Sequence, residues 1–207
     1  MENIGLDLNK AASILLDGGV VAFPTETVMG LGVVFDNYEA YKHLNELKGR
    51  PEDKPYTMML GNIKDIEKYA YINSDAKKII DTYMPGPITI LLKAKENVPN
   101  YVTHGTNIIG IRVPDFDILN KLLKIVKKPL LVPSANPSGM PPALDPEKVS
   151  IYFNKTLEYI IDYNSKGELP STIVDLSKDK PIILREGNIK KELIFNTLKE
   201  NKVWKLL

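Results

Sequence analysis

The chain of 207 residues is 43% hydrophobic, which is enough to bury a core and falls within the usual size of one domain. Its 27 lysines and arginines are balanced by 26 aspartates and glutamates, so the net charge of +1 supplies no long-range field for nucleic acid or an anionic membrane. The sequence has no cysteine and only two histidines, which excludes disulfides, thiol nucleophiles and cysteine-bound zinc and disfavours a histidine base.

No segment has the pattern of a membrane anchor or a leader. Residues 1–10 lack a basic region followed by an apolar core, and no apolar run approaches the roughly 20 residues that span a bilayer. We therefore expect a cytoplasmic protein that makes no membrane contact.

The first predicted elements surround a turn rich in hydroxyl groups and glycine. Apolar residues at helical spacing predict a helix over residues 7–17, which ends where Gly18 can adopt the left-handed conformation. Val20–Phe23 and Leu31–Phe35 are short, apolar and bounded by Gly or Pro, so they are predicted strands on either side of the Thr25–Gly30 turn. Such a turn is a favourable place to hold a ligand.

A second helix is predicted to follow the second strand. Asp36 or Asn37 is expected to cap it, and it runs to about Lys48. Its apolar residues line one face, so we expect its end, from Lys48 to Arg50, to point toward solvent or a ligand.

The rest of the chain mixes strands with helices. Further strands are predicted over residues 56–60, 88–92, 108–113, 130–132, 159–161, 173–176 and 182–184. Further helices are predicted over residues 63–69, 74–83, 118–126, 146–153 and 191–199. Because strands outnumber helices and do not alternate strictly with them, we predict an α/β fold in which helices cover the faces of a mixed sheet, as a single domain over residues 1–207.

A compact basic loop follows the second helix. Lys48 and Arg50 are separated by one glycine, and Lys54 comes soon after, between Pro51 and Pro55. Arginine offers a planar fork and lysine a mobile point charge, so this loop can bind a phosphate chain. The alternative is that these cations only cap the end of the helix.

Two further arginines stand at the ends of apolar strands. Arg112 ends the strand predicted from residue 108, and Arg185 follows the strand that ends at residue 184. A guanidinium beside an apolar sheet needs an anionic partner, which can be Glu186, Asp115 or a bound carboxylate or phosphate. Internal salt bridges and ligand contact therefore both remain open, although strand ends are where open sheets bind ligands.

Ser134 and Asn136 follow a buried strand two residues apart. In extended backbone this spacing points both side chains to one side, where they can bind phosphate oxygens or a sugar. The alternative is an Asn turn with a helix cap. A serine nucleophile is disfavoured, because the Gly-x-Ser-x-Gly context is absent.

The turn itself offers Thr25, Glu26 and Thr27. The threonine hydroxyls can bind a small polar substrate and Glu26 can act as a base or a metal ligand, or all three can be ordinary turn or capping residues. His43 and His104 lack metal-ligand spacing, so we expect surface or packing roles and no metal site in the protein.

Together these segments resemble the YrdC/Sua5 family of threonylcarbamoyl-AMP synthases in its short single-domain form. The motifs that carry the resemblance run in order along nearly the whole chain: PTETVMGLG at 24–32, KGRP at 48–51, PGPIT at 85–89, IRVP at 111–114, PSAN at 133–136, STIVD at 171–175 and REG at 185–187. The sequence departs from the family pattern at Met29, Lys54, Met59, Phe116 and Pro142-Ala143.

The resemblance implies a twisted mixed sheet with a basic concave face and a nucleotidyltransferase reaction. L-threonine, bicarbonate and ATP, bound with Mg²⁺, would form threonylcarbamoyl-AMP and pyrophosphate, and a downstream transfer complex would use the product for the t6A modification of tRNA, with tRNA contact by this chain also open. By similarity, Thr27, Arg112 and Ser171 would hold threonine. The residues expected at ATP are Arg50, Lys54, Ser134 and Arg185, and the catalytic set would be Lys48, Arg50, Ser134 and Asn136.

The chemistry implied by the resemblance depends on cations more than on a proton-transfer base. The reaction brings two anions together and releases pyrophosphate, so Lys48, Arg50 and Arg185, with Mg²⁺ on the phosphates, are expected to form an electrostatic clamp. Two other classes stay open: a non-catalytic RNA-binding module, and a domain that forms carbamoyl-adenylate as in hydrogenase maturation.

Overall fold

The computed structural model describes residues 3–49, 55–153, 156–167 and 169–199. Two residues predicted to bind ATP, Arg50 and Lys54, lie outside the described residues. Trp204, near the end of the chain, lies outside them as well.

The first helix and strands form as the sequence predicts. Helix α1 (Leu8–Leu16) begins after Asp7, whose carboxylate accepts hydrogen bonds from the amides of Asn9 and Lys10. Strands β2 (Val21–Phe23) and β3 (Gly30–Val34) then pair in antiparallel fashion around the threonine-rich turn. Both strands are fully buried, which fits their short apolar sequences.

Helix α2 (Tyr38–Lys48) follows with well-formed caps at both ends. Of the two predicted caps it uses Asn37, whose side chain accepts a hydrogen bond from the amide of Ala40. The helix ends at Gly49, which has a φ of 54°. Glycine tolerates this left-handed conformation without steric cost, so the chain can leave the helix sharply.

The remaining elements have the following bounds. The strands are β1 (Ile4–Gly5), β4 (Thr57–Met59), β5 (Ala70–Tyr71), β6 (Ile88–Ala94), β7 (Ile108–Arg112), β8 (Leu130–Val132), β9 (Tyr159–Ile161), β10 (Thr172–Asp175) and β11 (Ile182–Arg185). The helices are η1 (Ile63–Asp65), α3 (Ile66–Tyr69), α4 (Ser74–Tyr83), α5 (Asn100–Thr103), α6 (Asp117–Val126), α7 (Pro146–Phe153) and α8 (Lys191–Lys199).

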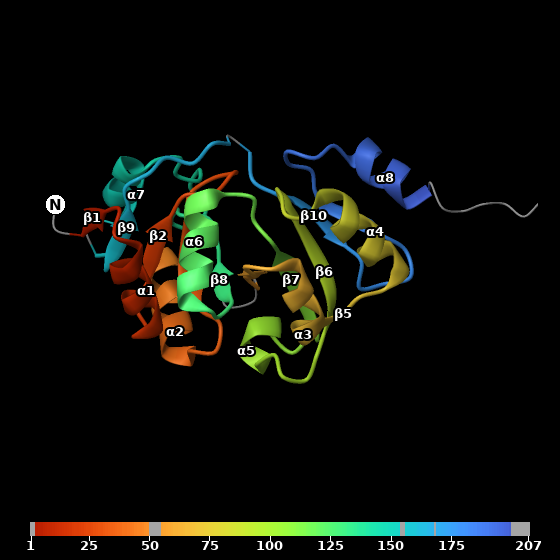
Figure 1. Cartoon of the computed structure of the whole chain (residues 1–207), viewed down its shortest axis with the longest axis horizontal. Helices are drawn as coiled ribbons and strands as arrows, with labels where there is room; N and C mark the ends of the chain where they lie inside the picture. The colour runs from red at the N-terminus through yellow and green to blue at the C-terminus, as the bar shows by residue number, and fades with distance from the viewer. Residues whose placement is uncertain (1–2, 50–54, 154–155, 168, 200–207) are drawn as a thin grey trace, which may run out of the picture.

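The described strands form one mixed sheet in the order β1-β9-β2-β3-β8-β4-β7-β6-β10-β11, with β5 added beside β6. Parallel pairs such as β4 with β7 and β6 with β10 occur together with antiparallel pairs such as β6 with β7. This confirms the predicted α/β fold with a mixed sheet and helices on its faces. Figure 1 shows α4 and α8 at one end of the molecule and α1, α2, α6 and α7 around the other.

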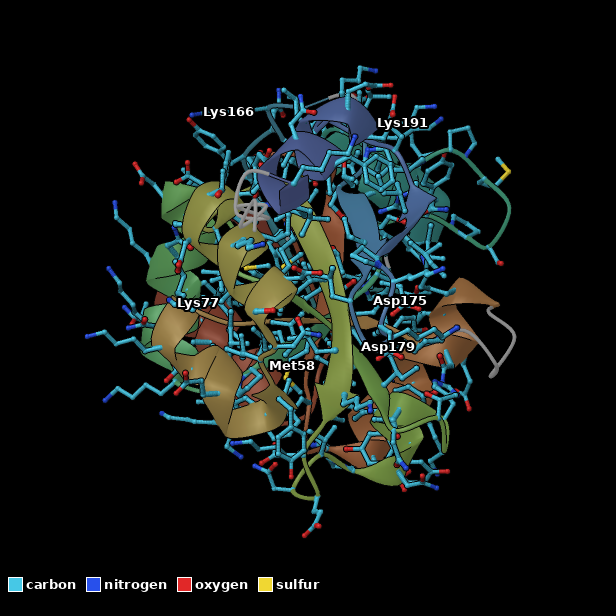
Figure 2. All side chains as sticks on the ribbon, turned by 90° about the vertical axis from the view of Figure 1, so that its right-hand side faces the viewer. Met58, Lys77, Lys166, Asp175, Asp179 and Lys191 are labelled. Atoms are coloured by element: carbon cyan, nitrogen blue, oxygen red, sulfur yellow. The ribbon has the colours of Figure 1, made fainter. Side chains whose placement is uncertain are left out.

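Two apolar clusters hold the helices against the sheet. The larger one joins residues of the sheet, such as Met58 and Ile90, to α2 and α4. The smaller one lies where α1 and α6 pack on the strands around Phe23. Figure 2 shows charged side chains such as Lys77 pointing outward, whereas Met58 lies inside and is completely buried.

Three short elements were not predicted from the sequence. β1, β5 and α5 have two to four residues each, which is too few to show a period. None of the described helices is long and apolar enough to cross a membrane.

The connection from β9 to β10 positions the functional region. β9 is the second strand from one edge of the sheet and β10 is the second from the opposite edge, so residues 162–171 must cross most of it. On the way, Lys166 donates its amide to the carbonyl of Thr25, and the Ser165 hydroxyl accepts the amide of Thr25. This crossing segment therefore brings Ser171 to the same region as the threonine-rich turn.

Candidate active site

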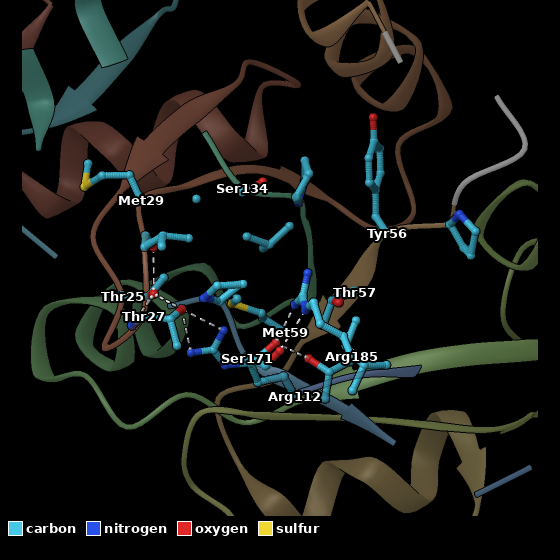
Figure 3. A pocket seen from close by; sticks show the side chains of 18 residues that line it. Thr25, Thr27, Met29, Tyr56, Thr57, Met59, Arg112, Ser134, Ser171 and Arg185 are labelled. Atoms are coloured by element: carbon cyan, nitrogen blue, oxygen red, sulfur yellow. Dashed lines mark hydrogen bonds between the residues drawn. The ribbon is translucent and has the colours of Figure 1, made fainter. Parts of the chain in front are cut away.

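A pocket lies over the middle of the sheet, between the threonine-rich turn and the ends of β10 and β11. Its space of about 160 Å³ is small compared with the several hundred cubic ångströms of most sites for larger ligands, so its enclosed part suits an amino-acid-sized group. Five of the predicted site residues line it, as Figure 3 shows: Thr27, Arg112, Ser134, Ser171 and Arg185. The structure therefore brings together residues that are distant in the sequence.

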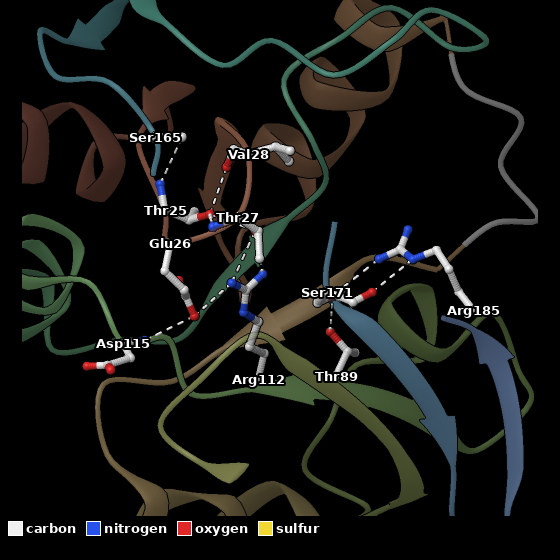
Figure 4. Close-up of polar contacts among 10 residues, drawn as sticks. All are labelled: Thr25, Glu26, Thr27, Val28, Thr89, Arg112, Asp115, Ser165, Ser171 and Arg185. Atoms are coloured by element: carbon white, nitrogen blue, oxygen red, sulfur yellow. Dashed lines mark hydrogen bonds and ion pairs between the residues drawn. The ribbon is translucent and has the colours of Figure 1, made fainter. Parts of the chain in front are cut away.

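The threonine-rich turn is held by a directed chain of hydrogen bonds (Figure 4). The Thr25 hydroxyl donates to the carbonyl of Val28 at 2.7 Å and lies 2.8 Å from the Thr27 hydroxyl. Because a hydroxyl has one hydrogen, Thr27 must be the donor in the second contact. The Thr27 oxygen also accepts both Nη1 and Nη2 of Arg112 at 3.2 Å. The hydroxyl of Thr27 is thus fully used inside the protein.

Arg112 has a carboxylate partner of its own. Its Nη2 lies 2.8 Å from Oε1 of Glu26, and the two side chains are only 5% and 12% exposed. The same oxygen accepts the amide of Asp115 at 3.1 Å. Of the partners considered from the sequence, an internal salt bridge is present, but with Glu26 rather than with the carboxylate of Asp115. Glu26 is therefore neither an exposed charge nor a helix cap.

Arg185 differs from Arg112 in that no described carboxylate lies within ion-pair distance of it. Its Nε donates to the Ser171 carbonyl at 3.0 Å and its Nη2 to the Ser171 hydroxyl at 3.2 Å. Partial desolvation, followed by the charge of Arg112, lowers the pKa of Arg185. The predicted alternative partner, Glu186, instead accepts hydrogen bonds from Lys190 and the amide of Lys191. Arg185 is thus a cation that a bound anion can pair with.

Ser171 links this arginine to the interior of the sheet. Its hydroxyl lies 2.9 Å from that of Thr89 on β6, and both residues are buried. Gly187 makes this arrangement possible, because a Cβ there would lie 2.1 Å from the carbonyl oxygen of Pro170. Gly167 has a similar part in the crossing segment, since a Cβ would lie 2.6 Å from the carbonyl oxygen of Glu26. Close backbone approach therefore builds both sides of the pocket.

Lys48 does not face solvent or the pocket, contrary to the prediction. It is 2% exposed, and its ammonium donates to the carbonyl oxygens of Ser134 at 2.6 Å and Asn136 at 2.5 Å. The helix ends as expected, but the loop after β8 folds over its last turn, which the periodicity of the helix alone does not reveal. Lys48 therefore links the end of α2 to this loop.

Ser134 and Asn136 do lie on one side of their loop, and they contact each other. The Ser134 hydroxyl donates to Oδ1 of Asn136 at 2.6 Å, and Nδ2 of Asn136 donates to the carbonyls of Pro137 and Met140. Asn136 is buried and does not line the pocket, in keeping with the turn interpretation. Ser134 alone of the two borders the pocket.

Several lining residues were not selected from the sequence. Thr89 lies in the PGPIT motif and Met59 departs from the family pattern, but neither was a predicted site residue. Tyr56 also lines the pocket, and its hydroxyl donates to Oδ1 of Asn45 at 2.5 Å. Ile173 and Val132 add apolar surface. Alternation in the strands indicates which residues share a face, but not that this face is hollow.

The histidines have the packing and surface contacts expected of them. Nε2 of His104 lies 3.4 Å from the Tyr41 hydroxyl, and Nε2 of His43 lies 3.6 Å from Oε1 of Glu158. Within the described part of the chain, no three acidic or histidine side chains are grouped as a metal ion would require. The polar side chains that line the pocket among the described residues are hydroxyls and guanidiniums, which can donate hydrogen bonds to an anion.

Comparisons with known proteins extend this description. A family model of Sua5, YciO and YrdC proteins, described as "Telomere recombination", matches residues 13–187. A threonylcarbamoyl-AMP synthase of Pyrococcus abyssi is 34% identical over 195 residues, which are 93% of this chain and 57% of that protein. A putative threonylcarbamoyl-AMP synthase of Methanocaldococcus jannaschii is 38% identical over 176 residues, which are 84% of this chain and 83% of that protein.

A solved structure shares the fold. The crystal structure of P. abyssi Sua5 complexed with L-threonine matches with a TM-score of 0.91 and 33% identity, covering 95% of this chain and 61% of that one. The present chain therefore spans little more than half the length of these Pyrococcus relatives.

Proposed function

We propose that this chain, which belongs to the YrdC/Sua5 family, is an enzyme. In the proposed reaction it synthesises threonylcarbamoyl-AMP and pyrophosphate from L-threonine, bicarbonate and ATP. One observation carries the proposal: a small polar pocket holds two guanidiniums, of which Arg112 is paired with a carboxylate and Arg185 has no carboxylate partner among the described residues. A relative of the same fold is described as complexed with L-threonine, whose carboxylate is an anion of suitable size.

The proposed reaction joins two anionic reactants. The threonine amine attacks the carbon of bicarbonate, and loss of water leaves a carbamate. A carbamate oxygen then attacks the α-phosphorus of ATP, and the bond to the pyrophosphate oxygen breaks. ATP binds as its Mg²⁺ complex, so the metal ion neutralises part of the negative charge on the phosphates. The cationic side chains of the protein then stabilise the remaining charge. The protein's main tasks are to position the reactants and to stabilise negative charge.

The two groups of residues assigned by similarity meet at one point. Ser171 and Arg112, expected at threonine, border the same pocket as Arg185 and Ser134, expected at ATP. The hydrogen bonds from Arg185 to Ser171 put the two sets in direct contact. Arg185 is therefore suited to the junction, where the carbamate meets the phosphates. Arg50 and Lys54 remain predicted contacts of the phosphates.

Lys48 and Asn136 are better suited to supporting roles than to contact with the reacting atoms. Both are buried and hydrogen-bonded within the loop that carries Ser134. In the proposed enzyme they hold that loop in place. Delivery of the product to a tRNA-modifying complex, direct tRNA contact and a cytoplasmic location belong to the same proposal.

The test is a product assay with ATP, Mg²⁺ and bicarbonate, with and without L-threonine. We expect pyrophosphate release that depends on threonine, together with an adenylate of the mass of threonylcarbamoyl-AMP. Release supported instead by carbamoyl phosphate would identify the hydrogenase-maturation type of chemistry. Salt-sensitive RNA binding with no pyrophosphate release would contradict an enzyme altogether.

A further inference from the structure

The buried ion pair between Glu26 and Arg112 is placed where it can control the pocket. A guanidinium with 5% side-chain exposure needs a partner, because an unpaired buried charge is strongly unfavourable. Glu26 supplies that partner from the threonine-rich turn, whereas Arg112 comes from the end of β7. The pair therefore ties the turn to the sheet directly beside the pocket (Figure 4).

The geometry of the pair fixes one part of the guanidinium and leaves another part unused. Oε1 of Glu26 takes Nη2, and the Thr27 hydroxyl takes both Nη1 and Nη2. Nε of Arg112 is buried and has no hydrogen-bond partner among the described residues, and the same is true of Oε2 of Glu26. Glu26 and Thr27 thus hold the terminal nitrogens of Arg112 and fix the plane of its guanidinium.

The charges around the pocket are distributed unequally. Glu26 forms an ion pair with Arg112, whereas no described carboxylate forms an ion pair with Arg185. Without Glu26, two guanidiniums with no carboxylate partner among the described residues would face one small pocket, and the charge of Arg112 already helps to lower the pKa of Arg185. The carboxylate of Glu26 is therefore the described group that both pairs with the charge of Arg112 and fixes its orientation.

We propose that Glu26 is a positioning residue that acts through Arg112, and that the Thr27 hydroxyl also positions Arg112 and does not contact the ligand. Glu26 and Thr27 orient the guanidinium of Arg112 toward the pocket before any ligand arrives. The ligand, L-threonine, rests on the proposed function, whereas the orientation of Arg112 does not. The two can therefore be tested separately.

Arginine side-chain NMR provides the direct test. The chain contains only three arginines, Arg50, Arg112 and Arg185, so the Nε–Hε region should show three signals that Arg112→Lys and Arg185→Lys assign. In Glu26→Gln, which keeps the shape but removes the charge, we expect hydrogen exchange at Nε of Arg112 to accelerate at least about 10-fold, as a lost 1.4 kcal/mol restraint would give. Glu39→Gln, which removes an exposed partner of Lys42, is the matched control and should leave the signal unchanged.

Unchanged exchange at Arg112 in Glu26→Gln would overturn the proposal. If Glu26→Gln fails to fold, the double variant Glu26→Gln/Arg112→Met decides. Recovery of folding in that neutral pair supports a role exerted through Arg112, whereas no recovery contradicts it.

Calorimetry with L-threonine adds the functional readout. We expect the wild type to bind, Glu39→Gln to bind equally, and Glu26→Gln to bind at least about 10-fold more weakly, equivalent to 1.4 kcal/mol. A wild type that does not bind threonine would contradict the proposed function while leaving the NMR result on Glu26 intact. Full affinity in Glu26→Gln would overturn the positioning role.

Discussion

Arg112 and Arg185 occupy similar places in the sequence and very different places in the molecule. Each ends an apolar strand, but β7 is an inner strand of the sheet and β11 is at its edge. Arg112 is 4% exposed and paired with Glu26, whereas Arg185 is exposed and, among the described residues, donates hydrogen bonds to Ser171.

The contrast follows from what each position demands. The end of an inner strand is covered from several sides, so a guanidinium there needs a carboxylate partner that is buried with it. An edge strand leaves its last residue partly hydrated, so a charge can persist there without an ion pair to any residue that the structure describes. The pocket therefore combines a fixed arginine with an available one, and only the available one can pair fully with an incoming anion.

The largest expected effect separates the two arginines by stability. Arg112→Met leaves the Glu26 carboxylate buried and unpaired, and we expect unfolding free energy to fall by about 3–5 kcal/mol. Arg185→Met loses only its hydrogen bonds to Ser171 and should cost about 1 kcal/mol. Urea denaturation of both variants measures the difference. Equal losses would show that burial does not distinguish the two residues.

Close packing behind the Arg185 side of the pocket gives the next effect. In Gly187→Ala the new Cβ would lie 2.1 Å from the Pro170 carbonyl oxygen, so the backbone must shift. We expect a loss of about 3 kcal/mol and weaker threonine binding, because Ser171 moves with this segment. Gly139→Ala is the control: its Cβ meets nothing within 4 Å, but its φ of +85° is unfavourable for alanine. That variant should lose about 1–2 kcal/mol and bind normally.

Activity should depend on Arg185 more than stability does. Arg185→Met is expected to reduce threonine-dependent pyrophosphate release about 100-fold, because the cation proposed to pair with the reacting anions is lost. Arg185→Lys should recover only part of this rate, since lysine lacks the planar fork. Steady-state pyrophosphate release by the folded variants is the measurement. Full activity of Arg185→Met would remove the main support for the proposed site.

Lys48 tests whether a buried cation outside the pocket acts only through structure. Lys48→Met leaves the carbonyls of Ser134 and Asn136 without their ammonium donor, so we expect a loss of about 2 kcal/mol in unfolding free energy. Threonine affinity measured by calorimetry should change little, since Lys48 does not line the pocket. A large loss of affinity with unchanged stability would instead place Lys48 among the ligand contacts.

The smallest effect concerns Glu186, the neighbour of Arg185 that does not pair with it. Hydrogen bonds from the Lys191 amide and the Lys190 ammonium lower the pKa of Glu186 below its usual 4.5. A lowered pKa means that the unfolded chain binds more protons, so this contribution to stability is present above pH 4.5 and is lost as the pH falls through the folded value. Glu186→Gln should slightly flatten acid unfolding and leave threonine binding unchanged. Weaker binding would imply that Glu186 helps to orient Arg185.

The sequence by itself determined most of the elements. Residues 74–83, 146–153 and 130–132 form the predicted helices and strand with matching bounds, because apolar period and capping residues act over a few neighbouring positions. It also identified both described arginines as candidates for ligand contact, since a cation ending an apolar strand is conspicuous. The sequence did not indicate Thr89 or Tyr56 as site residues, because they are related to the other site residues only by lining the same pocket in the folded protein.

The tertiary structure alone decided what each charge meets. Thr27 and Arg112 are 85 residues apart in the chain, and Thr89 and Ser171 are 82 apart. Whether a guanidinium finds a carboxylate, or an ammonium such as that of Lys48 is buried beneath a loop, depends on strand order and on the segment that crosses from β9 to β10. Local patterns carry no such information, because the cost of burying a charge is set by atoms that only folding brings near.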